Sequence, residues 1–175
     1  MPPIAIIIIP LVIIGVLIYA ATRPNTFRTE RSTTINATQA KIFGNINDLG
    51  KWPTWSPWEK LDPNVQRTLS DPSSGVGASY AWEGNRKIGA GSMEIVESEK
   101  SSKIVMKLEF LKPFKASNMA EFTLTKKGTS TEVTWAMYGP QLYKAKLMGT
   151  LIDCDAMVGK QFAEGLANLK ALVEK

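Results

Sequence analysis

The sequence predicts an α+β domain in which a curved antiparallel sheet wraps a long C-terminal helix. Between residues 79 and 138, apolar and polar residues alternate, as in strands with one buried and one solvated face. Over residues 146–173, apolar residues recur every three or four positions, which indicates one amphipathic helix. No repeat or second linker divides residues 27–175, so we expect this range to form one domain with its own core.

A strand and a short helix are expected before the alternating region. The strand covers residues 27–35, and Asn36 or Thr38 can cap the helix that follows. This helix is expected at residues 39–49, ahead of Gly50, because its apolar residues have helical spacing: Ile42, Phe43, Ile46 and Leu49.

Five strands follow, separated by turn signals such as Gly84-Asn85 and Lys126-Lys127-Gly128. We expect them at residues 79–83, 88–97, 103–110, 116–125 and 131–138. The alternation places one set of side chains on the inner face: Tyr80, Trp82, Met93, Ile95, Ile104, Met106, Leu108, Phe110, Val133, Trp135 and Met137.

Three of the five tryptophans lie within residues 52–58, in the order Trp-Pro-Thr-Trp-Ser-Pro-Trp. Pro53 and Pro57 disfavour a long helix, so we expect a kinked turn or short helix that holds the rings in set directions. The rings can form a wall of the hydrophobic core or the wall of a ligand cavity, and the sequence leaves both interpretations open.

Residues 4–21 form a run without a charge. A helix of this length rises about 1.5 Å per residue and can cross a hydrocarbon layer of about 30 Å. We therefore predict a transmembrane anchor at residues 1–22, followed by a short linker at 23–26. A cleaved secretory signal is the alternative, but no positively charged segment precedes the run.

Charges after this run predict its orientation. Arg23, Arg28 and Arg31 follow the run, whereas only the terminal amine precedes it. By the positive-inside tendency, we expect a single-pass membrane protein whose domain faces the cytoplasm. A single cysteine allows no intrachain disulfide, which agrees with that compartment, although a periplasmic domain remains the alternative.

The composition argues against several functions. A net charge of +5 suits an anionic membrane surface, but the lysines are scattered rather than gathered on one helix, so no nucleic-acid partner is expected. The chain has no histidine and one cysteine, Cys154, so no metal site or cofactor is expected either. Cys154 falls on the apolar stripe of the last helix, where we expect an inert thiol.

Two residues are candidates for acid–base chemistry. Glu83 is a candidate by elimination, although the alternation turns it away from Trp82, and a catalytic role would require a bulge near Gly84. Tyr80 shares the face of Trp82 and could donate a hydrogen bond to a carbonyl substrate; a tyrosine bonded to the backbone is the alternative. No nucleophile with an adjacent base was found, so neither residue is assigned a catalytic role.

Several motifs lie in a fixed order along the chain: Phe27, Arg31-Ser32 and Ile35; the tryptophan segment with Glu59 and Asp62-Pro63; Tyr80 to Asn85; Gly89 to Met93; and Val133-Thr134-Trp135. In this order they resemble the polyketide cyclase/dehydrase-like branch of the START/Bet v 1-like (SRPBCC) superfamily, over residues 27–175. The resemblance implies a helix-grip fold with an internal cavity for hydrophobic molecules such as lipids, sterols, polyketides or aromatic compounds.

Together, the patterns and the resemblance predict a membrane-anchored binding module for a lipid-like or aromatic molecule, without an assigned enzymatic activity. The alternatives are a metal-free cyclase or dehydratase and an accessory subunit of a larger membrane complex. The predicted ligand-binding residues are Trp52, Trp55, Trp82, Met93, Met106, Phe110, Trp135, Met137 and Leu151.

Overall fold

The computed structural model describes residues 3–150 and 153–175, with side chains from residue 8 on. Its elements are α1 (Pro3–Thr22), β1 (Thr26–Ile35), α2 (Gln39–Ile46), η1 (Leu49–Thr54), η2 (Pro57–Lys60), β2 (Gln66–Leu69), β3 (Ser79–Glu83), β4 (Ala90–Glu99), β5 (Lys103–Lys112), β6 (Ala116–Lys127), β7 (Ser130–Pro140), α3 (Tyr143–Met148) and α4 (Cys154–Val173), where η marks a 3₁₀ helix.

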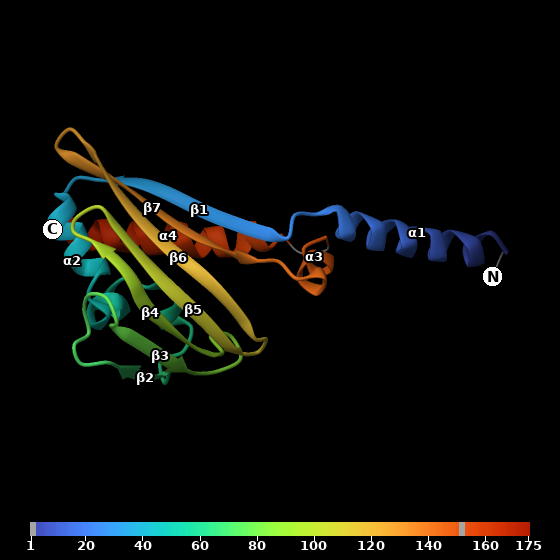
Figure 1. Ribbon diagram of the computed structural model, residues 1–175, viewed down its shortest axis with the longest axis horizontal. Coiled ribbons are helices and arrows are strands. Elements are labelled where there is room, and N and C mark those ends of the chain that lie inside the picture. The colour runs from blue at the N-terminus through green and yellow to red at the C-terminus, as the bar shows by residue number, and fades with distance from the viewer. Residues whose placement is uncertain (1–2, 151–152) are drawn as a thin grey trace.

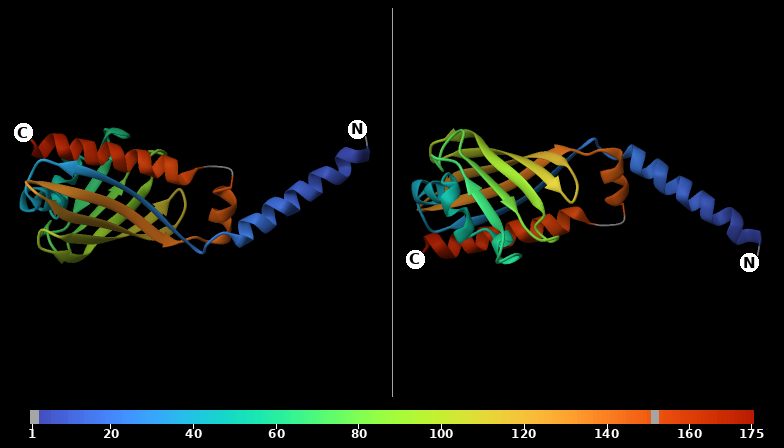
Figure 2. Two further views of the ribbon diagram at one scale, coloured as in Figure 1. Left: turned by 90° about the horizontal axis from the view of Figure 1, so that it is seen from above. Right: turned by 90° about the horizontal axis from the view of Figure 1, so that it is seen from below.

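The strands form one antiparallel sheet in the order β1-β7-β6-β5-β4-β3-β2. This sheet curls around α4, and α1 extends away from it at the end where α3 lies (Figures 1 and 2). The fold is therefore α+β and helix-grip-like, as predicted. β4 begins at Ala90 rather than at residue 88, because Gly89 has a φ of 68°, which is not an extended conformation.

The chain between α2 and β2 is short and tightly capped. α2 begins where the Thr38 hydroxyl accepts a hydrogen bond from the Lys41 amide at 3.3 Å. It ends at Ile46 rather than at the predicted Leu49, which instead begins η1 after an Asp48 cap. Pro57 stands in the first turn of η2, where its missing N–H costs no hydrogen bond.

Two further predictions about elements are wrong. The single helix expected at residues 146–173 is two helices, because α3 ends at Met148 with Gly149 as its C-cap, and the Asp153 side chain starts α4 by accepting the Ala156 amide at 2.9 Å. Cys154 consequently lies in the first turn of α4 and is exposed instead of facing the core. The loop expected before residue 79 contains β2, an edge strand whose four residues are all exposed.

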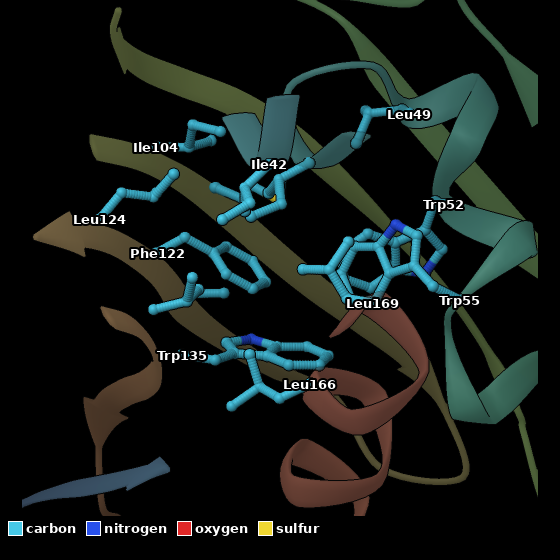
Figure 3. Packing of buried hydrophobic residues seen from close by; sticks show 14 of the residues in the cluster. Ile42, Leu49, Trp52, Trp55, Ile104, Phe122, Leu124, Trp135, Leu166 and Leu169 are labelled. Carbon is cyan, nitrogen blue, oxygen red and sulfur yellow. The ribbon is translucent and has the colours of Figure 1, made fainter. Parts of the chain in front are cut away.

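An aromatic cluster occupies the core (Figure 3). Trp52 and Trp55 come from the end of η1 and meet edge to face, with ring centroids 4.6 Å apart. Both rings contact Trp135 of β7, which also stacks on Phe162 of α4 at 4.3 Å. The two prolines thus hold the tryptophan segment against both sheet and helix.

α1 touches the domain through α3, where the Tyr143 hydroxyl donates to the Leu17 carbonyl at 3.0 Å. Apolar side chains of α1 such as Ile9, Leu11 and Ile18 are exposed. Within the described part of the chain, no helix has both the length and the apolar character required to cross a membrane. The anchor predicted at residues 4–21 is therefore not supported by the structure.

Candidate functional site

A cavity of about 500 Å³ lies between the inner face of the sheet and α4. This volume is within the range of pockets that enclose small organic ligands, about 300–1,000 Å³. Aromatic rings, methionines and aliphatic side chains make up most of its wall: Trp52, Trp58, Tyr80, Trp82, Met93, Met106, Leu108, Phe110, Ala120, Trp135, Met137, Val158 and Phe162.

The opening of the cavity is formed by two loops and the start of α4. Lys87 and Ile88 come from the loop between β3 and β4, Lys112 is the last residue of β5, and Pro113 follows it in the turn to β6. Met157 of α4 completes the rim and is exposed. The Lys112 ammonium is paired with Glu83 at 2.7 Å, so Lys87 is the lysine of this rim that has no ion pair within the described residues.

One carboxylate lies in this apolar wall. Glu59 of η2 has a side chain that is only 10% exposed. Its Oε1 accepts a hydrogen bond from the Tyr80 hydroxyl at 2.6 Å, and its Oε2 accepts one from the Arg67 Nε at 2.7 Å. The Arg67 Nη2 also contacts Oε2. A buried carboxylate requires such partners, because an unpaired one would be strongly destabilising.

The contacts with Glu59 change the pKa values of its two partners. Burial and then the hydrogen bond to Glu59 raise the pKa of Tyr80 far above its ordinary value, so the phenol remains a donor. The hydrogen bond with Glu59 also raises the pKa of Arg67, which keeps the guanidinium charged. We call these three residues the Glu59 network.

Trp135, which lines the cavity, carries a polar atom without a partner. Its Nε1 is buried and makes no hydrogen bond with any described residue. Most buried polar atoms in proteins are hydrogen-bonded, so this indole N–H is an unused donor.

A model of the family described as polyketide cyclase / dehydrase and lipid transport matches residues 26–174. The chain belongs to this family. Among curated proteins, none matches the sequence.

Solved structures share the fold of this polyketide cyclase / dehydrase and lipid transport domain at low identity. The KanY protein superposes with a TM-score of 0.65 at 15% identity, over 87% of this chain and 100% of its own. Protein CV1439 from Chromobacterium violaceum gives 0.59 at 15% identity, over 87% and 99%. DynU16, from the dynemicin biosynthetic locus, gives 0.60 at 14% identity, over 87% of this chain and 48% of its own. Such likeness establishes the fold and leaves function to the site.

The structure places most of the predicted ligand-binding residues of this family member on the cavity wall. They are Trp52, Trp82, Met93, Met106, Phe110, Trp135 and Met137. Trp55 does not line this cavity, because it packs into the aromatic cluster and its Nε1 donates to the Asn45 carbonyl at 3.2 Å. Leu151 lies outside the described residues.

The two acid–base candidates are placed very differently. Glu83 lies at the end of β3, is exposed, and forms an ion pair with Lys112 that lowers its pKa. Glu83 does not line the cavity, because β3 pairs with β4 in regular register up to Glu83 and the side chain stays on the outer face. Tyr80 lines the cavity and is bonded to the Glu59 carboxylate rather than to the backbone.

Sequence analysis missed Glu59 and Arg67 as site residues. Glu59 appeared only as part of a family motif, and Arg67 lies on β2, which was expected to be a loop. The available signal was a single carboxylate directly after three tryptophans, because a charge within an apolar segment needs a partner.

Within the described residues, no three acidic or cysteine side chains lie close enough together to hold a metal ion.

Proposed function

We propose that this domain is a binding module that encloses a hydrophobic small molecule between its sheet and α4. The observation that supports this proposal is the cavity of about 500 Å³, whose wall is built largely from aromatic and methionine side chains. Methionine is flexible and polarizable, so several on one wall suit a loosely shaped apolar ligand. The family description, which includes lipid transport, agrees with this class of ligand.

Native mass spectrometry of the full chain in mild detergent tests the proposal. We expect a retained molecule in about one-to-one ratio, which organic extraction then identifies. A chain that retains nothing and also fails to bind a panel of lipids and the neutral dye N-phenyl-1-naphthylamine would contradict it.

An enzyme of the cyclase or dehydratase type is a second candidate, favoured by the contact between Tyr80 and Glu59 on the wall. The Glu59 carboxylate, held by the Tyr80 hydroxyl, can accept a proton from a substrate as a general base without a metal. Incubation of the extracted molecule with the protein tests this candidate: loss of water or ring closure should appear with the wild type and disappear with Glu59→Gln. An unchanged molecule would leave binding as the function.

The location of the domain stays a prediction from the sequence. The prediction is that residues 4–21 anchor the chain in a membrane and that the domain faces the cytoplasm. Its support is the exposed apolar surface of α1 from Ile8 to Tyr19, since apolar surface of this extent is usually covered by lipid or protein. Alkaline carbonate extraction tests attachment: an anchored protein stays in the pellet, and release into the supernatant would contradict the anchor.

A third alternative function is an accessory subunit of a membrane complex. It predicts that the protein migrates together with other proteins in mild detergent.

A further inference from the structure

The Glu59 carboxylate has hydrogen-bonding capacity that its protein partners leave unused. Each carboxylate oxygen can accept about two hydrogen bonds. Oε2 receives two N–H groups of Arg67, whereas Oε1 receives the Tyr80 hydroxyl as its one partner among the described residues. Oε1 therefore retains one acceptor position at the cavity wall.

The charge of the network restricts what can occupy that position. The Arg67 guanidinium neutralises Glu59, so the pair offers little net attraction for a cationic ligand. An anion without a proton has no hydrogen to donate to the free acceptor position. A neutral hydroxyl group needs no counter-charge and donates a hydrogen, so it fits this position.

The surroundings of Glu59 restrict the rest of the ligand. Trp58 and Trp82 lie on the same wall, and the methionines at positions 93 and 106 lie farther along the neighbouring strands. These side chains offer an apolar surface on which a hydrocarbon or aromatic body can pack, with its polar group at the Glu59 network.

We infer that Glu59 is a ligand-recognition residue whose Oε1 accepts a hydrogen bond from a hydroxyl group, so that the ligand is a neutral, largely apolar alcohol or phenol. This inference rests on the proposed binding function and names the ligand class of the same cavity. Tyr80 and Arg67 are positioning residues, because both hydrogen-bond the carboxylate, and Arg67 also offsets its charge.

Two probes with the same ring system test the inference: 2-naphthol, which carries a donor, and 2-methoxynaphthalene, which lacks one. Binding of both to the full chain is measured by fluorescence titration in one detergent, and partition into protein-free micelles is subtracted. A hydrogen bond to a charged acceptor is worth about tenfold in affinity, so the wild type should bind 2-naphthol about tenfold more tightly than the ether.

Variants assign that preference to Glu59. The double variant Glu59→Leu/Arg67→Leu removes both charges together, so neither is left unpaired, and it should bind the two probes equally. Glu59→Gln keeps the shape but accepts a weaker hydrogen bond, so its preference should fall to a few-fold even if the double variant does not fold. Glu94→Gln makes the same change on the exposed face of β4, outside the cavity, and should keep the preference.

The outcomes separate this inference from the binding function on which it rests. The inference is wrong if both probes bind the wild type equally, or if the tenfold preference for 2-naphthol remains in Glu59→Gln and in the double variant. In either case Glu59 does not recognise a hydroxyl group, while binding in the cavity stands. If Glu94→Gln lowers the preference as much as Glu59→Gln does, the effect is not specific to Glu59 and the inference is wrong as well. If neither probe binds, the proposed function fails as well.

Discussion

The indole of Trp135 lies so close to the backbone of Gly165 that a Cβ atom at this glycine would be 2.7 Å from Cζ3 of the ring. Pro57 approaches the same point at 3.1 Å. Gly165 therefore lets α4 pack directly on the aromatic cluster, and the tryptophan cannot easily move because it stacks on both Phe122 and Phe162.

Gly165→Ala should destabilise the protein despite the better helix propensity of alanine. Overpacking a core costs about 1–3 kcal/mol, which outweighs a propensity gain of about 1 kcal/mol. Gly44→Ala is the matched control, since Gly44 is also helical but a Cβ there would have no neighbour within 4 Å. Urea denaturation should show a lower free energy of unfolding for Gly165→Ala and an equal or higher one for Gly44→Ala; the same sign for both would contradict the packing argument.

Asp62 fixes the loop at the opening of the cavity. It is buried, and its Oδ2 accepts the Asn85 amide at 2.6 Å while its Oδ1 accepts the Asn64 amide at 3.0 Å. Asp62→Ala leaves these amides without their acceptor and should cost about 1–3 kcal/mol of unfolding free energy. Hydrogen exchange at Asn85 should become faster, whereas Glu94→Ala on the exposed face of β4 should change neither quantity. Unchanged exchange at Asn85 would show that the loop does not depend on Asp62.

The raised pKa of Tyr80 predicts a pH dependence of stability. Because burial and Glu59 raise the folded-state pKa above the ordinary value of 10.0, the stabilisation is complete below that pH and is lost as pH rises above it. The free energy of unfolding should fall by up to about 1.4 kcal/mol per pH unit from this group alone.

Comparison of variants isolates that contribution. Tyr80→Phe removes the titrating phenol, so its stability should fall less steeply between pH 9 and 11 than that of the wild type. Tyr19→Phe changes an exposed tyrosine of α1 and should follow the wild-type curve. Parallel curves for Tyr80→Phe and wild type would mean that Tyr80 does not titrate with unfolding.

Regular patterns explain how much of the fold was predictable. Period-two alternation from residue 79 onward identified β3 to β7 and the inward side chains of the cavity, because a strand's two faces differ in burial. β2 could not be identified in this way, since all four of its residues are exposed and show no alternation. The break between α3 and α4 was missed because apolar residues continue at helical spacing across Gly149.

The site was harder to predict than the fold, because its polar part depends on contacts between distant elements. Alternation correctly turned Tyr80 inward and Glu83 outward, yet the partner of Tyr80 comes from a 3₁₀ helix twenty-one residues earlier in the chain. Trp55 and Trp52 are three residues apart, but one packs into the core and the other also lines the cavity. Their separation depends on how Pro53 and Pro57 direct the segment, which a sequence pattern does not specify.

Filling the cavity should abolish retention of a ligand while leaving the fold intact. Ala120 of β6 is buried on the cavity wall, opposite Met137 on β7. Ala120→Phe places a ring in the cavity space, so a bound molecule must move or be expelled, which we expect to weaken binding at least about tenfold. Thr125→Phe adds a similar ring to the exposed face of the same strand and should leave binding unchanged.

Dye titration and thermal unfolding of both variants complete this experiment. The neutral dye N-phenyl-1-naphthylamine should bind the Thr125→Phe variant as it binds the wild type and should fail to bind Ala120→Phe. The melting temperature of Ala120→Phe should stay close to that of wild type, because a cavity of about 500 Å³ accepts a phenyl ring without displacing the core. Wild-type dye binding in a folded Ala120→Phe variant would mean that the dye binds elsewhere, and α1 with its exposed apolar side chains would then be the surface to test.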